Sequence, residues 1–223
     1  MLSPAAKPPV GQARILVTGF DPFGGQPVNP SWLATQTLDG AEIDGHRVVA
    51  AQLPTRFGDA LATLQDLLGQ HRPALVLCTG QAGGRAALSL ERVAINIEDA
   101  RIPDNAGRQP IDTPVIADGP AAYFTTLPIK AMLAALLAEG IRADVSQTAG
   151  TFVCNHVFYG LMHLLATDRR WSGVRGGMVH VPWLPQQGAP SMTHEQVVRG
   201  LEVALQCALR TQVDVRLQAG AIS

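Results

Sequence analysis

The stretch Gly150–Met162 reads GTFVCNHVFYGLM, and its pattern is that of a helix that begins just after a strand. The segment Val145–Thr148 precedes it and is the predicted strand. Apolar side chains then recur at spacings of three or four residues, as on the buried face of a helix: Val153, Val157, Leu161, Leu164 and Leu165. Thr151 is of a residue type favoured as an N-cap. The stretch therefore predicts one strand–loop–helix unit of an α/β fold.

Cys154 lies in or beside the first turn of this predicted helix. Unpaired backbone N–H groups and the positive end of the helix dipole favour negative charge there. A thiol at such a position ionises more readily than a free one, and the thiolate is the nucleophilic form of cysteine. Position alone leaves two interpretations open, because a free cysteine often serves only as a small apolar residue.

Strands and helices alternate along the rest of the chain. Short apolar segments predict strands at Arg14–Phe20, His46–Leu53, Ala74–Thr79, Leu88–Ile97 and Gly176–Val181. Helical periodicity and cap residues predict helices after Asn29-Pro30 and at Arg56–Gln70, Leu127–Glu139 and Thr193–Leu209. This alternation predicts a single-domain, three-layer α/β/α sandwich with a mostly parallel, twisted sheet. We expect residues 13–215 to form that domain, between a flexible extension at 1–12 and a tail at 216–223.

Composition excludes several functional classes. The 223 residues are 47% hydrophobic and 16% charged, with a net charge of −1, so no nucleic-acid or membrane-surface partner is expected. Three cysteines without a CxxC pair argue against a disulfide framework or a zinc site, and no metal or other cofactor is expected. The first residues lack a signal-peptide core, and no apolar run could span a bilayer. These features favour a cytoplasmic protein.

Several chemically active side chains are predicted to gather at one edge of the sheet. Phe20 and Phe23, Gln81, Cys154 and His180 all follow or end predicted strands, and the carboxyl ends of parallel strands meet at one edge. Cys154 and His180 could form a nucleophile–base pair if an acid oriented the imidazole. Glu91, Asp99 and Asp104 are the acids near this edge, and Glu91 could equally be a charge on the rim. His180 could equally be a core histidine.

Four segments carry a resemblance to a known family. They are Thr18–Trp32 (TGFDPFGGQPVNPSW), Gly80–Asn105 (with GQAGGR, ERVAIN and ARIPDN), Ala149–His163 (AGTFVCNHVFYGLMH) and Gly176–Gln187 (GGMVHVPWLPQQ). Together they resemble the cysteine peptidases of the pyroglutamyl peptidase I, or pyrrolidone-carboxylate peptidase, family, in the same order and over nearly the whole predicted fold. The resemblance implies a hydrolase that removes N-terminal pyroglutamyl residues from peptides.

The resemblance also assigns residues to roles. It implies a catalytic triad of Glu91, Cys154 and His180, and it selects Glu91 over Asp99. It implies a pocket for the five-membered lactam, walled by Phe20, Phe23, Thr55, Phe152 and Val153, and we expect Gln81 to shape that pocket. Arg101 and the Cys154 N–H are expected as donors to the developing oxyanion.

Family members are commonly oligomeric, so the resemblance further implies a homo-oligomer, a tetramer in particular. Two alternatives stay open at this point. The chain could be an amidohydrolase of different acyl specificity, or a non-catalytic relative that binds pyroglutamyl-blocked peptide ends.

Overall fold

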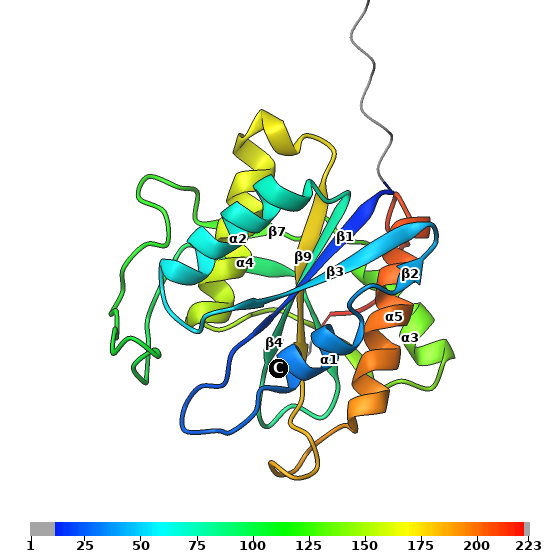
Figure 1. Cartoon of the computed structure of the whole chain (residues 1–223), viewed down its shortest axis with the longest axis horizontal. Coiled ribbons are helices and arrows are strands. Elements are labelled where there is room, and N and C mark those ends of the chain that lie inside the picture. Colours follow the sequence, from blue (N-terminus) through cyan, green and yellow to red (C-terminus); the bar gives the residue numbers. More distant parts are fainter. Residues whose placement is uncertain (1–11, 221–223) are drawn as a thin grey trace, which may run out of the picture.

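The computed structural model describes residues 12–220, and its central feature is one seven-stranded sheet covered by helices on both faces (Figure 1). The strands are β1 Arg14–Phe20, β2 Glu42–Ile43, β3 His46–Leu53, β4 Leu75–Gln81, β5 Leu88–Glu91, β6 Val93–Ile95, β7 Ala122–Phe124, β8 Ala143–Ser146 and β9 Arg175–Val181. Strands β6 and β7 form a separate two-stranded sheet. The helices are α1 Pro30–Thr37, α2 Asp59–His71, α3 Ile129–Ala138, α4 Val153–Thr167 and α5 His194–Arg210, with a 3₁₀ turn at Arg169–Trp171.

The order of strands in the large sheet is β2-β3-β1-β4-β9-β5-β8. Strands β3, β1, β4 and β9 run parallel to one another. At the far side, β5 pairs antiparallel with β9, and β8 pairs parallel with β5. The short β2 pairs antiparallel with β3. The predicted mostly parallel sheet is confirmed.

Alternation along the central strands separates two apolar cores. Ile15 and Val17 of β1 face one core, whereas Leu16 between them faces the other. The first core contains buried residues of α1, α3 and α5, and the second contains those of α2 and α4. Figure 1 shows the same division, with α2 and α4 on one side of the sheet and α1, α3 and α5 on the other. The predicted three-layer, single-domain architecture is confirmed.

One predicted strand is wrong in an informative way. Leu88–Ile97 was expected to be continuous, but the chain leaves the large sheet at Arg92 and continues as β6, which pairs with β7. The reason is the edge strand β8, whose last residue, Ser146, pairs with Glu91. Beyond this point the Arg92 N–H still donates to the Ser146 carbonyl, while the Arg92 carbonyl accepts from Thr125 N–H in the segment after β7.

Smaller differences concern where helices begin. The second helix starts at Asp59 rather than Arg56, because Gly58 adopts a left-handed conformation with φ of 76° and stands outside the helix. Phe152, not Thr151, is the N-cap of α4. The Thr151 hydroxyl instead donates to the Asp99 carbonyl at 2.6 Å, so it tethers the neighbouring loop. The predicted capping of α1 by Asn29 and of α5 by Thr193 is confirmed.

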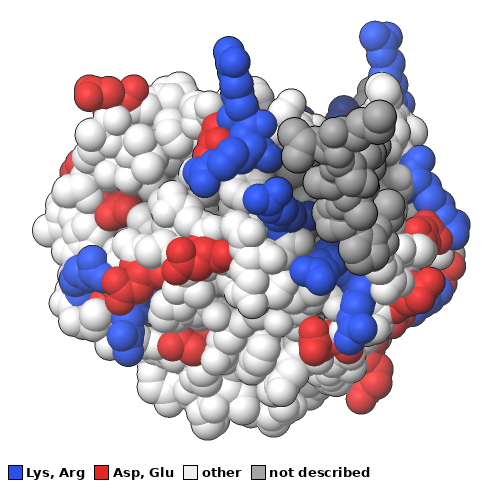
Figure 2. Space-filling model, turned by 45° about the horizontal axis from the view of Figure 1, so that its top comes forward, with Lys and Arg blue, Asp and Glu red and all other residues white. Residues whose placement is uncertain are grey.

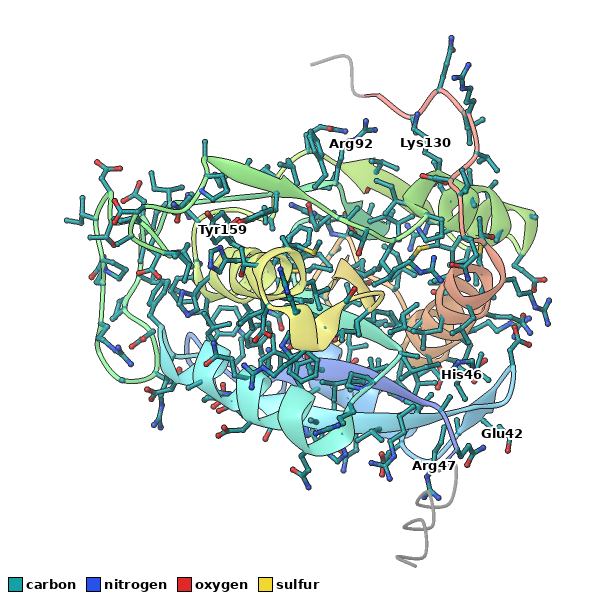
Figure 3. All side chains as sticks on the ribbon, turned by 90° about the horizontal axis from the view of Figure 1, so that it is seen from above. Glu42, His46, Arg47, Arg92, Lys130 and Tyr159 are labelled. Carbon is teal, nitrogen blue, oxygen red and sulfur yellow. The ribbon has the colours of Figure 1, made fainter. Side chains whose placement is uncertain are left out.

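The chain ends outside the regular elements are only partly described. The extension expected at residues 1–12 lies outside the described residues except for residue 12. After α5, the Asp214 carboxylate accepts from the Lys130 and Ala131 N–H groups at the start of α3, and the Ala219 carbonyl accepts from Arg92. Figure 3 shows Arg92 and Lys130 on the side of the molecule where this C-terminal segment runs. Within residues 12–220, no helix is both long and apolar enough to cross a membrane.

Candidate active site

The carboxyl ends of β4 and β9 point toward the lower side of the molecule in Figure 1, and α4 covers the neighbouring face of the sheet. His180 is the second-to-last residue of β9 and is buried. Its Nδ1 lies 2.7 Å from Glu91 Oε1. A carboxylate in this position accepts the Nδ1 proton and leaves Nε2 as the ring nitrogen available for chemistry.

Glu91 reaches His180 from within the sheet, not from its rim. It is the last residue of β5 and is fully buried, so the interpretation as a rim charge is wrong. Because β5 runs antiparallel to β9, Ser89 lies opposite His180, and Glu91 is the diagonal neighbour two residues along. The sequence pattern could not reveal this pairing, since it depends on a reversal of strand direction between distant segments.

Cys154 is the second residue of α4 and is partly exposed. The space shared by Cys154 and His180 lies over Gly80 of β4. A Cβ atom on Gly80 would stand 2.7 Å from Cys154 Sγ and 3.2 Å from His180 Nε2, so only glycine lets the thiol and the imidazole approach each other there. The structure thus brings Cys154, His180 and Glu91 together.

The electrostatics of this cluster favour a charged imidazole. Burial lowers the pKa of His180, but the adjacent Cys154 and the Glu91 carboxylate outweigh burial and raise this pKa to about 9. Burial raises the pKa of Glu91, yet the His180 hydrogen bond, together with smaller contributions from Ser146 and Arg85, leaves it below its ordinary value. A Glu91 carboxylate and a His180 imidazolium can therefore coexist at neutral pH.

The other two cysteines differ in environment. Cys78 is fully buried in β4, and burial raises the pKa of its thiol to about 12, which suits a core residue. Cys207 is half-buried on α5, where its Sγ lies 3.8 Å from the Thr211 hydroxyl.

Aromatic rings gather beside the cysteine helix. The ring of Phe152 lies 6.0 Å from that of Phe23 and 5.4 Å, edge-on, from that of Phe57. Phe20 and Val153 are fully buried in the core that includes Phe57. The structure therefore places the predicted wall residue Phe152 against both Phe23 and Phe57, with Phe20 and Val153 in the same core as Phe57. Sequence reasoning missed Phe57, because nothing in its local pattern marks it.

The remaining predicted pocket residues occupy different places. Thr55 is buried, and both its N–H and its hydroxyl donate to Asp21, which fixes it beside the loop after β1. Gln81 ends β4 next to Val181, and its Oε1 accepts from Gln187 Nε2 at 3.3 Å. The Arg101 side chain is exposed and makes no hydrogen bond or ion pair within residues 12–220, so the structure does not place it against Cys154.

The segment after Arg101 is a long irregular loop between β6 and β7, held by hydrogen bonds at several points. The buried Asp104 carboxylate accepts from the N–H groups of Phe57, Ala106 and Arg108. Near its base, Glu98 Oε1 lies 2.6 Å from His156 Nδ1. Sequence reasoning missed His156, because a histidine on a helix face gives no sign of a partner 58 residues away.

The far end of this loop is held by α4. The Tyr159 hydroxyl donates to the Pro120 carbonyl, and its ring centroid lies 5.1 Å from that of Tyr123 on β7. Figure 3 shows Tyr159 on α4 toward this side of the molecule. The helix that carries Cys154 therefore also anchors the loop beside the site.

Arg85 also contacts the cluster, and sequence reasoning gave it no role. Its Nη1 donates to Glu91 Oε1 at 2.6 Å, and its Nη2 donates to the Thr148 carbonyl at 3.0 Å. An arginine after two glycines is typical of any turn, so the sequence carried no signal for this contact.

Comparisons with known proteins identify the family of the chain. The family model described as pyroglutamyl peptidase matches residues 13–211. Pyrrolidone-carboxylate peptidase 1 of Ralstonia nicotianae is 58% identical over 211 residues, which cover 92% of this chain and 97% of the relative. The pyrrolidone-carboxylate peptidase of Klebsiella pneumoniae is 55% identical over 214 residues, covering 94% and 99%.

Solved structures agree as well. Pyroglutamyl peptidase I from Bacillus amyloliquefaciens superposes with a TM-score of 0.90 at 44% identity, covering 93% of this chain and all of that one. A mutant pyrrolidone carboxyl peptidase from P. furiosus gives a TM-score of 0.86 at 38% identity, covering 90% and 100%. Since the family model spans nearly the entire described chain and relatives exceed half identity, the chain belongs to the pyroglutamyl peptidase family.

Proposed function

We infer that the chain is a cysteine-type pyroglutamyl peptidase, a hydrolase that removes an N-terminal pyroglutamyl residue from peptides. The observation that carries the mechanism is that Cys154 and His180 meet over Gly80, while Glu91 contacts Nδ1 of the same imidazole. We assign Cys154 as nucleophile, His180 as general acid–base and Glu91 as the acid that orients the imidazole.

The first half-reaction forms a thioester. Cys154 Sγ attacks the carbonyl carbon of the pyroglutamyl residue, while His180 Nε2 holds the proton released by the thiol. The tetrahedral intermediate then breaks its carbon–nitrogen bond, and His180 delivers that proton to the departing amine. Glu91 keeps the imidazole oriented and offsets its charge throughout.

The second half-reaction regenerates the thiol. A water molecule replaces the amine and gives a proton to His180 as its oxygen attacks the thioester carbon. The carbon–sulfur bond then breaks, the proton passes to Cys154, and pyroglutamate leaves.

The developing oxyanion needs fixed hydrogen-bond donors. The Cys154 N–H lies in the first turn of α4, where backbone donors have no partner within the helix. Arg101 is a second candidate donor, which would act after its exposed side chain turns toward the substrate.

The proposed pocket suits a small neutral ring. Phe23 and Phe152 offer apolar faces beside the cysteine helix, Phe57 supports Phe152 edge-on, and Phe20 and Val153 belong to the same core as Phe57. We propose that Thr55 and Gln81 complete the border of the pocket. A free N-terminal ammonium would lose its hydration in such a slot, whereas a cyclised end carries no charge. Preference for a blocked end follows from this difference.

A substrate panel tests the proposal. Hydrolysis rates for pyroglutamyl-, prolyl- and glutaminyl-7-amido-4-methylcoumarin should rank the pyroglutamyl compound first. Cys154→Ser should abolish turnover without changing the thermal unfolding midpoint, because serine preserves the shape of the side chain. A faster prolyl rate would instead favour an amidohydrolase of different acyl specificity, and binding without turnover would favour the non-catalytic alternative.

We also propose a cytoplasmic homo-oligomer, without a nucleic-acid or membrane partner. Three free cysteines support a reducing compartment. The face in Figure 2 carries charges of both signs among wide uncharged areas, which supports the absence of a nucleic-acid surface. Exposed apolar side chains support self-association; they include Phe124, Leu137 and Ile111.

A further inference from the structure

Glu91 has an unusual distribution of hydrogen bonds. Its Oε1 accepts hydrogen bonds from both His180 Nδ1, at 2.7 Å, and Arg85 Nη1, at 2.6 Å. Its Oε2 is buried and has no hydrogen-bond partner within residues 12–220. Loss of Arg85 would therefore leave a fully buried carboxylate with His180 as its one cationic neighbour among the described residues.

Arg85 also links the Glu91 carboxylate to the loop that leads into α4, the helix of Cys154. Its Nη2 donates to the carbonyl of Thr148, which lies in the loop between β8 and α4. The side chain is 30% exposed, so it closes the cluster at the surface. The Arg85 guanidinium thus links three segments: the loop after β4, the end of β5 and the loop between β8 and α4.

A count of charges shows why a second cation matters. During the reaction the cluster contains two anions, the Glu91 carboxylate and the Cys154 thiolate. His180 supplies a single positive charge and is buried with Glu91. A buried charge without a partner is strongly destabilising, so the imidazolium alone could not offset both anions.

The groups that face Glu91 come from three directions. His180 approaches from β9, the Ser146 hydroxyl stands opposite on β8, and Arg85 approaches from the surface. The next residue, Arg92, directs its guanidinium to the Ala219 carbonyl and so serves the C-terminal segment.

We propose that Arg85 is a positioning residue for catalysis: it neutralises and holds Glu91 so that the His180 imidazolium stays available to Cys154. The role rests on the proposed peptidase function, and Arg85 acts through Glu91 without touching the substrate. A planar guanidinium suits this task because it binds a carboxylate and a carbonyl at once through separate N–H groups.

The test compares Arg85→Met and Arg85→Lys with the wild-type protein on pyroglutamyl-7-amido-4-methylcoumarin. Arg85→Met should lower kcat by about 10- to 100-fold, the value of one charge-assisted hydrogen bond, with KM within about twofold. The acidic limb of its pH profile should move to higher pH, because an unpaired buried carboxylate binds protons more readily. Arg85→Lys should recover part of the loss.

Arg199→Met is the matched control, since Arg199 forms ion pairs with Glu139 and Glu202 on the surface. Its kcat should equal that of the wild type. Chemical rescue then separates charge from packing. N-ethylguanidinium should restore activity to Arg85→Ala, whereas N-ethylurea, a neutral molecule of similar shape, should not.

Three results would overturn the role of Arg85. One is an unchanged kcat and pH profile in Arg85→Met. Another is a loss confined to KM, which would make Arg85 a substrate contact. The third is a loss matched by a lower unfolding temperature and rescued equally by both additives, which would make it structural. Failure of the proposed function is distinguishable, because the wild type itself would then be inactive.

Discussion

At the residue scale, the site depends on a few atoms placed by distant parts of the chain. Cys154 and His180 were predicted from their positions in a helix and a strand. Selection of Glu91 among three acids required the family resemblance, because its contact with His180 arises from antiparallel pairing. Gly80, Arg85 and Phe57 could not be predicted, since each matters only through neighbours far away in sequence.

The role assigned to Gly80 leads to the first prediction. Gly80→Ala should reduce kcat/KM by about 100-fold or more, because the new methyl group would displace Cys154 Sγ, only 2.7 Å from its ideal position. Gly69→Ala is the matched control: its Cβ would meet nothing within 4 Å in α2, and alanine there should stabilise the fold by about 0.5–1 kcal/mol. Kinetics and thermal unfolding measure both effects. Full activity in Gly80→Ala would refute the close approach of thiol and imidazole.

The raised pKa of His180 leads to the second prediction. Because the pKa of about 9 exceeds the ordinary 6.5, the charged imidazole stabilises the fold below pH 6.5, and this contribution is lost as pH rises through 9. In the pH profile of kcat/KM, the rate should therefore fall above about pH 9, when His180 no longer holds the proton for the leaving amine. Glu91→Gln should shift this limb to lower pH, because the carboxylate raises the pKa of His180. A limb that stays at the same pH in Glu91→Gln would contradict the contact.

At the element scale, most strands and helices could be predicted from local periodicity, but which strands pair with one another could not. β1 and β3 follow from local periodicity with the predicted bounds. The break between β5 and β6 could not be predicted, because Leu88–Ile97 has strand character throughout and only the end of β8 interrupts it. The first turn of α4 differs for a similar reason: Thr151 is used to hold a loop, so Phe152 begins the helix without a side-chain cap.

The loop between β6 and β7 leads to the third prediction. Asp104→Asn should lower the free energy of unfolding by about 1–3 kcal/mol, because an amide cannot accept from all three backbone N–H groups that the carboxylate satisfies. KM should rise more than kcat falls, since Phe57 beside Phe152 loses its anchor. Asp112→Asn, an exposed change in the same loop, should alter neither quantity. Equal KM and stability in the two variants would show that the anchor has no effect on the pocket.

At the scale of the whole molecule, the layers could be predicted because alternating strands and helices permit few arrangements. The reversed direction of β5 and β8 could not be predicted from this alternation. That reversal is what positions Glu91 beside His180. Assembly is also a property of this scale, and it stays a prediction here.

The fourth prediction concerns that assembly. Light scattering coupled to size-exclusion chromatography should give about four times the 23.6 kDa of the chain, because the family resemblance implies a tetramer. Exposed apolar side chains such as Phe124 and Leu137 are the candidates for its interfaces. Changing Phe124 to Asp, at a position that is 70% exposed, should leave the monomer fold intact, and a smaller mass would place that residue in an interface. A monomeric wild-type protein would refute the proposed oligomer.

The central claim is that one thiol, paired with His180, performs the chemistry, and alkylation by iodoacetamide at pH 6 measures it most directly. Mass spectrometry of the digested protein should find Cys154 modified far faster than Cys78 or Cys207, with hydrolysis of the pyroglutamyl substrate lost in proportion. His180→Ala should remove most of this excess reactivity. Alkylation of Cys154 no faster than that of Cys207, or full activity after its modification, would contradict the account.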